Sequence, residues 1–404
     1  MKYIILRLKR FCGFITGIVF FLSGIVKLLD PVGAGLVVSE YFNFLHIPFL
    51  DPIAKQTASF LAFMETAAGA ALITGVWRRL TAYTAVIMQV FFTIISIILV
   101  IFNPEMDCGC FGEVIHLTHM ETLLKNIVLC LLLAGYSFPT KALGGPKKKK
   151  YVSFGLVMIS VLAFSIYSWL SIPLMDFTDY KPASVLKESD EFPTSEADLY
   201  DVTLVYEKEG IRKEFCLEDI PDSTWNYVST ETRLKKEYGG SVIDLSFYDD
   251  HDNYRDHLAA EGKVMVISVY DPYIIAKRWS NIAEFIAKSE KAGFRTLLLT
   301  AATENDIRTI YSGLDGATQK ALSRCTYFAD YKTLITLNRS NAGLTYFCEG
   351  YLIRKWPARS RPDAEELDEI FHGDDTEIIL DDSTRDSLTF QGFLLYIFAV
   401  MLLF

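Results

Sequence analysis

Five long apolar segments constrain the fold of this 404-residue chain more than any other feature of its sequence. Each has about 19 to 25 residues with almost no charge, enough to cross the ~30 Å hydrocarbon core of a bilayer as a helix. A backbone inside lipid must satisfy its own hydrogen bonds, so these segments predict a bundle of membrane-spanning helices. They are Phe11–Leu29, Ile53–Trp77, Leu80–Phe102, Met120–Phe138 and Val152–Pro173.

A shorter apolar segment, Phe390–Phe404, ends the sequence and is about one helical turn short of a comfortable span. Three alternatives remain open for residues 389–404. The segment could cross a thin bilayer as a sixth span, lie in the interface, or pack on the other helices, with a slight preference for crossing.

Three clusters of basic residues fall on the same side of the membrane if the apolar segments alternate in direction. Lysine and arginine favour the cytoplasmic side of a membrane, so the clusters set the orientation. If the spans alternate, the N-terminus is cytoplasmic, and the loops Asp30–Pro52 and Asn103–His119 and the large domain before Leu388 lie outside. No small-residue cleavage site follows the first segment, so it is read as a retained span. The clusters are Lys2 to Arg10, Arg78 with Arg79, and Lys141 with Lys147–Lys150 in a basic loop.

We therefore expect a multi-pass protein of the bacterial inner membrane, with its large domain in the periplasm. The bilayer is its first partner, and a periplasmic protein is a second expected partner. The net charge of −10 argues against nucleic acid, which requires a basic face.

Two cysteines, Cys108 and Cys110, lie one residue apart in the loop Asn103–His119. That separation permits a disulfide, and its small ring should be strained and prone to exchange. Gly109 and Gly112 give such a turn its backbone freedom. Because disulfides persist on the outer side of a membrane, this pair predicts a catalytic thiol redox site, without establishing that the chain is an enzyme.

Polar side chains inside the apolar segments are functional candidates, because each charge costs a few kcal/mol at the centre of a bilayer. For Glu65, pairing with a lysine inside the bundle is as plausible as a proton-handling or ligand-orienting role. Transport of ions or small molecules through Glu65 and Lys125 is a further alternative. The candidates are Lys27, Glu65, Gln89, Lys125 and Asn126.

Two histidines, His116 and His119, lie close enough in sequence to the cysteines to raise the question of a metal. Mixed cysteine and histidine sites are chemically reasonable. The Cys-x-Cys spacing is shorter than the usual Cys-x2-Cys, however, and we do not predict a metal site.

Several of these residues together resemble the methylamine-utilisation MauE branch of the DoxX-like membrane proteins. The similarity covers about residues 1–140 and rests on Ser23–Pro31, on Glu65 in an Ala/Gly-rich segment, on Cys108–Gly112 and on Leu124–Asn126. It implies a four-helix bundle and an association with redox processes of the cell envelope. A dithiol in a membrane also needs an electron acceptor, and by analogy with other four-helix thiol oxidases a quinone is expected.

A basic loop and the fifth helix occupy residues 141–173, and the outer part of the chain follows. Residues 174–239 predict a linker and a β-hairpin, Val202–Tyr206 with Arg212–Leu217 about Glu209-Gly210. Residues 240–388 alternate strands and helices, including the strand Lys263–Tyr270, and end in the hairpin Leu344–Trp356 and the helix Ala364–His372.

This element order resembles the thioredoxin-like α/β fold. The redox Cys-x-x-Cys should follow the first core strand, but Asp271–Trp279 contains no cysteine, and no proline precedes the closing hairpin. Thiol exchange requires a thiolate, so the domain is predicted to be inactive at that position and to bind a partner.

Three further cysteines, Cys216, Cys325 and Cys348, suggest either one pair with one free thiol or three buried thiols, in a structural role. The acidic runs Asp249–Asp252 and Asp374–Asp382 are interpreted as solvated faces or loops, since neither has the EF-hand spacing of a calcium site.

Two functions are then in competition. The first is a redox protein whose Cys108 and Cys110 take electrons from exported thiols and support the maturation of exported proteins. The second is a non-enzymatic membrane scaffold, an accessory subunit of an envelope assembly, in which the Cys-x-Cys pair pins a loop.

Overall fold

The computed structural model describes residues 2–403 apart from 105, 107, 113, 138–147, 188–199, 209–210, 217–224, 235–240 and 276–277. Lys141, Lys147 and much of the predicted linker lie outside the described residues. The chain divides into two compact units. The membrane unit comprises Met1–Thr178 with Asp381–Phe404, and the α/β unit comprises Asp179–Leu380.

Among the described residues of the membrane unit, five helices are long and apolar enough to cross a bilayer, which confirms the five predicted segments. The chain is therefore a multi-pass membrane protein. Helix α1 packs on α3, α3 on α4, α4 on α5, and α5 on α1, which closes a ring of four helices. The five helices are α1 (Lys2–Leu29), α3 (Ala54–Thr74), α4 (Arg78–Phe102), α5 (His119–Ser137) and α6 (Lys148–Leu170).

Glycines let α1 and α3 approach closely. A Cβ atom added to Gly69 would lie 2.4 Å from the backbone nitrogen of Phe21, and one added to Gly17 would lie 3.0 Å from the carbonyl oxygen of Gly69. Small residues at such crossings are typical of packed membrane helices. This close packing brings Lys27 of α1 opposite Glu65 of α3.

The predicted outer loop Asp30–Pro52 is largely helical, which corrects the sequence prediction. It forms α2 (Pro31–Phe44) and a 3-10 helix, η1 (Pro48–Ile53). The Asp30 side chain accepts a hydrogen bond from Gly33 N at 2.9 Å and caps α2, with Pro31 in its first turn. With 14 residues, α2 is too short to span a bilayer.

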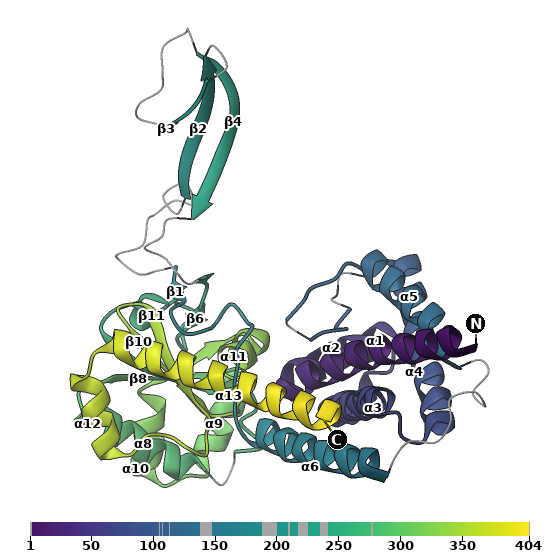
Figure 1. Cartoon of the computed structure of the whole chain (residues 1–404). Helices are drawn as coiled ribbons and strands as arrows, with labels where there is room; N and C mark the ends of the chain where they lie inside the picture. Colours follow the sequence, from purple (N-terminus) through teal and green to yellow (C-terminus); the bar gives the residue numbers. More distant parts are fainter. Residues whose placement is uncertain are drawn as a thin grey trace. The chain divides into compact units, whose positions relative to one another are not determined.

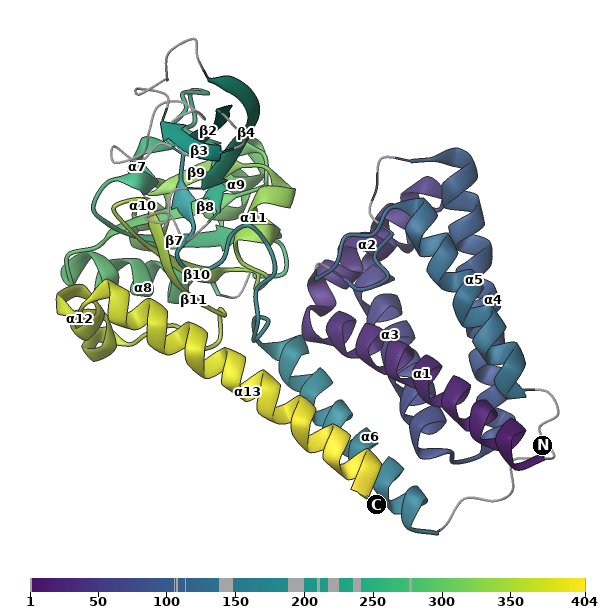
Figure 2. The same ribbon diagram turned by 45° about the horizontal axis from the view of Figure 1, so that its top comes forward.

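The C-terminal part of α13 (Asp375–Leu403) runs beside α6 in the membrane unit, as Figures 1 and 2 show. The rings of Phe164 and Phe393 stack at 4.5 Å, and Ser153 Oγ donates to the Val400 carbonyl at 2.7 Å. Of the three alternatives for this tail, the contacts favour packing on another helix. Most of the run Asp374–Asp382 forms the start of α13, where acidic side chains complement the helix dipole. Asp374, Glu377 and Asp381 are exposed, which agrees with the predicted solvated face.

The α/β unit contains an eight-stranded mixed sheet in the order β5-β1-β11-β10-β7-β8-β9-β6. Figure 2 labels its strands β7 to β11. Strands β7, β8 and β9 are parallel, and β10 and β11 are antiparallel to their neighbours. The strands are β1 (Val185–Leu186), β5 (Val242–Ile243), β6 (Phe247–Tyr248), β7 (Lys263–Val269), β8 (Arg295–Thr300), β9 (Thr326–Ala329), β10 (Gly343–Cys348) and β11 (Tyr351–Trp356).

Hydrophobic clusters cover both faces of this sheet. In β7, Met265 and Ile267 belong to one cluster, and Val264 and Val266 belong to the other. Burial on both faces explains why β7 reads as a continuous apolar run. The helices are α7 (His257–Ala260), α8 (Trp279–Lys291), α9 (Glu304–Ser312), α10 (Gly316–Ser323), α11 (Tyr331–Leu337) and α12 (Ala364–His372).

A second sheet has three antiparallel strands in the order β3-β2-β4, namely β2 (Tyr200–Lys208), β3 (Ile211–Cys216) and β4 (Asn226–Leu234). The pairing of β2 with β3 confirms the predicted hairpin. Its turn, Glu209-Gly210, lies outside the described residues. Strand β4 was not predicted from the sequence.

Candidate functional site

A cavity of about 260 Å³ lies inside the membrane unit and is walled by α1 to α5 and by the cysteine loop. Most of its lining is apolar. Its polar residues include Cys108 and Cys110 together with all five polar candidates from the spans, Lys27, Glu65, Gln89, Lys125 and Asn126. The structure therefore brings the predicted site residues together around one space.

The Cys-Gly-Cys turn is held on both sides. Tyr41 Oη donates to the Cys108 carbonyl at 2.9 Å, and Ser23 Oγ donates to the Cys110 carbonyl at 2.6 Å. Gly109 has a φ of +60°, and a Cβ atom there would lie 2.4 Å from Val37 Cγ1. The turn thus requires glycine for both its conformation and its space.

The two sulfur atoms are free thiols in different surroundings. Cys108 is 8% exposed, and its Sγ lies 2.8 Å from Thr122 Oγ1. It also shares a hydrogen bond with the Cys110 sulfur, which in turn has a hydrogen bond with Lys125. The Lys125 ammonium lies 5.0 Å from the centre of the Phe111 ring.

These contacts make the thiols chemically unequal. The hydrogen bond from Cys108, with the positive charges of Lys125 and Lys27, lowers the pKa of Cys110 to about 5 against the opposing effect of burial. The same hydrogen bond, followed by burial, raises the pKa of Cys108. Cys110 is therefore the thiolate of the pair at neutral pH, and the thiolate is the reactive form.

Glu65 forms an ion pair with Lys27, whose Nζ lies 2.6 Å from Glu65 Oε2. Lys27 also donates to Ser23 Oγ at 3.2 Å. The interpretation of Glu65 as the partner of a lysine inside the bundle is confirmed. The pair connects through Ser23 to the backbone of Cys110.

An amide network lines the cavity between α4 and α5. Gln89 Nε2 donates to the Asn126 carbonyl at 3.1 Å, and Asn126 Nδ2 donates to Ser96 Oγ at 2.6 Å. Both amides are almost fully buried. The bonds fix how each amide is oriented in the cavity wall.

Sequence reasoning missed two residues that hold the cysteines, Thr122 and Tyr41. Thr122 lies three positions before Lys125 and four before Asn126, so the spacing of one helical face could have pointed to it. Tyr41 gave no signal, because its helix was predicted as a loop.

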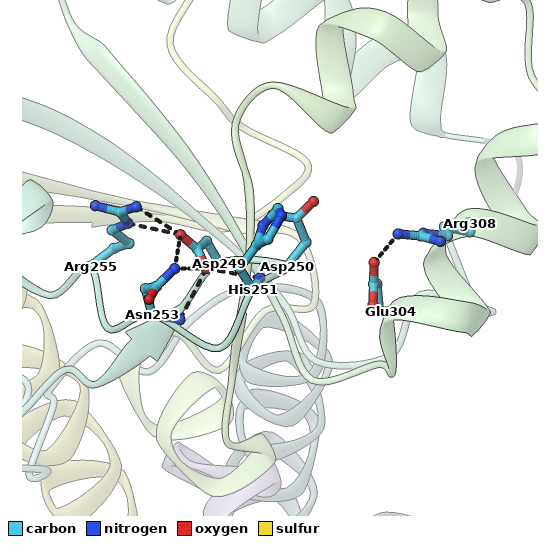
Figure 3. A network of polar contacts seen from close by, with 7 residues as sticks. All are labelled: Asp249, Asp250, His251, Asn253, Arg255, Glu304 and Arg308. Carbon is cyan, nitrogen blue, oxygen red and sulfur yellow. Dashed lines mark hydrogen bonds and ion pairs between the residues drawn. The ribbon is translucent and has the colours of Figure 1, made fainter.

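The two histidines do not join the cysteines. Within the described parts of the chain, one acidic and histidine group, Asp249, Asp250 and His251, is compact enough for a metal ion. The Asp249 carboxylate there accepts hydrogen bonds from Asn253 N at 3.0 Å and from Arg255 Nε at 2.9 Å, as Figure 3 shows. These bonds close a surface turn and account for the acidic run.

Cys325 and Cys348 are free thiols in the structure, and the side chain of Cys216 lies outside the described residues. Burial raises the pKa of Cys325 to about 12, so this thiol is unreactive. No exchange chemistry is expected from it.

Comparison with known proteins gives a family match within the membrane unit. Residues 2–139 match the family described as methylamine utilisation protein MauE, and residues 200–237 match a domain family of unknown function. The chain is also 24% identical over 162 residues to protein TlpB of Flavobacterium psychrophilum. That alignment covers 39% of this chain and 44% of TlpB, so it spans less than half of the relative's length. No solved structure matches the chain significantly.

Proposed function

We propose that this protein is a thiol oxidoreductase of the bacterial inner membrane, with Cys108 and Cys110 at the periplasmic face oxidising thiols of exported proteins. The observation that carries the proposal is that Cys108 and Cys110 line a membrane cavity together with Lys27 and Lys125. The match to the MauE family and the similarity to TlpB support a membrane protein tied to redox processes. The basic clusters support the orientation.

The reaction has two balanced halves. In the first, a thiolate of the exported protein attacks the Cys108–Cys110 disulfide, and the mixed disulfide resolves to a substrate disulfide and two protein thiols. In the second, the Cys108 thiol and the Cys110 thiolate give two electrons to a quinone, which takes one proton from Cys108 and one from solvent and becomes a quinol while the disulfide re-forms. The low pKa of Cys110 makes it the better leaving group in the first half.

The α/β unit is proposed to be a thioredoxin-like domain that binds the protein substrate. The central strand order β8-β7-β10-β11, with β7 and β8 parallel, supports this fold. The segment after β7 holds the exposed Tyr273 and Ile274, which are 63% and 76% exposed, where a thioredoxin would carry its cysteines. Apolar side chains at that position suit recognition of a partner, not exchange.

Trapping of mixed disulfides tests the proposal. In cells that express Cys110→Ser or Cys108→Ser, one remaining thiol should hold the substrate as a covalent adduct, visible on non-reducing gels and identified by mass spectrometry. The Cys108→Ser/Cys110→Ser variant is the matched control and should trap nothing. If neither single variant forms an adduct, and the wild-type pair never changes redox state with growth conditions, the proposal is wrong.

The scaffold function is the second candidate, and the clamped cysteine turn favours it. Tyr41 and Ser23 bond the turn through backbone atoms, as a structural loop would require. A scaffold would keep its cellular role in the double serine variant and lose it when Asp179–Leu380 are deleted. The redox protein would lose its role in both variants.

A further inference from the structure

One polar atom in the cavity wall has no partner. Gln89 is 1% exposed, and its Oε1 has no hydrogen-bond partner among the described residues. The amide cannot be turned to avoid this, because its Nε2 donates to the Asn126 carbonyl. A buried acceptor without a donor is unfavourable, so a ligand that brings a donor would bind favourably here.

The rest of the cavity limits what that ligand can be. Its lining is mostly apolar and includes the aromatic rings of Phe20, Phe42, Phe91 and Phe92. Lipid acyl chains would suit these rings but offer no donor for Gln89. A hydroxylated aromatic ring satisfies both requirements, since its faces are apolar and its edge carries O–H groups.

The redox groups lie in the same wall. Cys108, Cys110 and Lys125 line the cavity together with Gln89. Lys125 is a hydrogen-bond donor, which suits the carbonyl oxygen of an oxidised ring. The free Gln89 oxygen is an acceptor, which suits the hydroxyl of the reduced ring. The cavity therefore has one group for each redox form of the same molecule.

We propose that this cavity is the quinone site of the protein, in which Gln89 Oε1 accepts a hydrogen bond from the hydroxyl of the quinol. The inference rests on the proposed function for the electrons. The Cys108 thiol and the Cys110 thiolate give two electrons to the ring, which takes one proton from Cys108 and one from solvent, leaving a disulfide and a quinol. Binding of the ring does not itself require the cysteines.

A binding experiment without thiol chemistry tests the site. The full chain carrying Cys108→Ser/Cys110→Ser is placed in lipid nanodiscs and titrated with 2-heptyl-4-hydroxyquinoline N-oxide, a quinone-site ligand whose fluorescence is quenched on binding. Decylubiquinol and decylubiquinone then compete for the site. Their ring carbons are fully substituted, so they do not add to the remaining thiols.

Gln89→Leu should weaken competition by the quinol about tenfold, as expected for one lost hydrogen bond in a buried site, and competition by the quinone much less. Thr93→Val is the matched control, because Thr93 lies one turn along α4 and does not line the cavity. It should leave both affinities unchanged.

Two results would overturn the inference: non-saturable quenching, or equal quinol affinities in Gln89→Leu and Thr93→Val. The second would mean that water, and not a quinol, satisfies Gln89. Either result could occur while mixed disulfides still form in the trapping experiment. Failure of this site and failure of the proposed function are therefore distinguishable.

Discussion

At the residue scale, the different surroundings of Cys108 and Cys110 can be measured by alkylation. Iodoacetamide reacts with thiolates, so the labelling rate of Cys110 should rise with pH through a midpoint near its pKa of about 5. An ordinary thiol would have its midpoint near ~8.5. The rate is followed by mass spectrometry of the reduced protein between about pH 4 and 9.

Lys125→Met removes a positive charge beside the thiolate and therefore disfavours the charged form. The midpoint for Cys110 should move up by about one pH unit or more, and labelling at pH ~6 should slow accordingly. Lys55→Met is the control, because the Lys55 ammonium lies over the Trp169 ring, 4.3 Å from its centre, and does not line the cavity. Equal midpoints in the two variants would contradict the role of Lys125.

The Lys27–Glu65 ion pair gives a prediction about stability. Their side chains are 16% and 6% exposed, so Lys27→Met should leave a buried carboxylate without a partner and destabilise the protein by about 3–5 kcal/mol. Lys27→Met/Glu65→Gln removes both charges and should recover part of this loss. The free energy of unfolding of both variants is measured in mixed micelles with increasing dodecyl sulfate. If the two variants lose the same stability, the unpaired charge is not the cause of the loss.

Sequence reasoning found some of these residues and missed others for a physical reason. Lys27, Glu65 and Lys125 could be predicted because a charge stands out in an apolar segment. Tyr41 could not be singled out, because its helix was expected to be a loop, and Thr122 only by its place on the helical face of Lys125 and Asn126. Only the packing of α2 and α5 against the cysteine turn gives these hydroxyls a role.

At the scale of elements, the α1–α3 contact depends on glycine. Gly69→Ala would place a Cβ atom 2.4 Å from the Phe21 backbone nitrogen, so the helices must separate. We expect a loss of about 1–3 kcal/mol in the free energy of unfolding in micelles. Gly155→Ala in α6 is the control, because a Cβ there meets nothing within 4 Å. If Gly69→Ala and Gly155→Ala have the same free energy of unfolding, the close approach of α1 and α3 does not limit stability.

The elements also show where sequence patterns stop being informative. The five spans and the strands β7, β10 and β11 were predictable, because long apolar runs and short β-rich runs are strong signals. Helix α2 was missed although Asp30 and Pro31 form a standard helix start, because an outer loop was expected between two spans. Strands β1, β5 and β6 have two residues each, too few for any periodicity.

At the scale of the whole molecule, the proposed function assigns thiol chemistry to the membrane unit and substrate binding to the α/β unit. The cavity and its cysteines belong to the membrane unit, and each unit has its own hydrophobic clusters. The membrane unit includes the C-terminal part of α13, where Ser153 of α6 reaches Val400. A chain in which a short Gly/Ser linker replaces Asp179–Leu380 should therefore keep the site intact.

This shortened chain separates chemistry from recognition. Dithiothreitol is a small dithiol that needs no docking domain, so the shortened chain should oxidise it with decylubiquinone at a rate within about threefold of the full chain, a difference below ~0.7 kcal/mol in the barrier. With Cys110→Ser added, it should trap far less of the exported protein than the full-length variant does. Quinol formation is followed by absorbance and adducts by non-reducing gels. If dithiothreitol oxidation disappears with the α/β unit, that unit takes part in the chemistry, and the division of work between the two units is wrong.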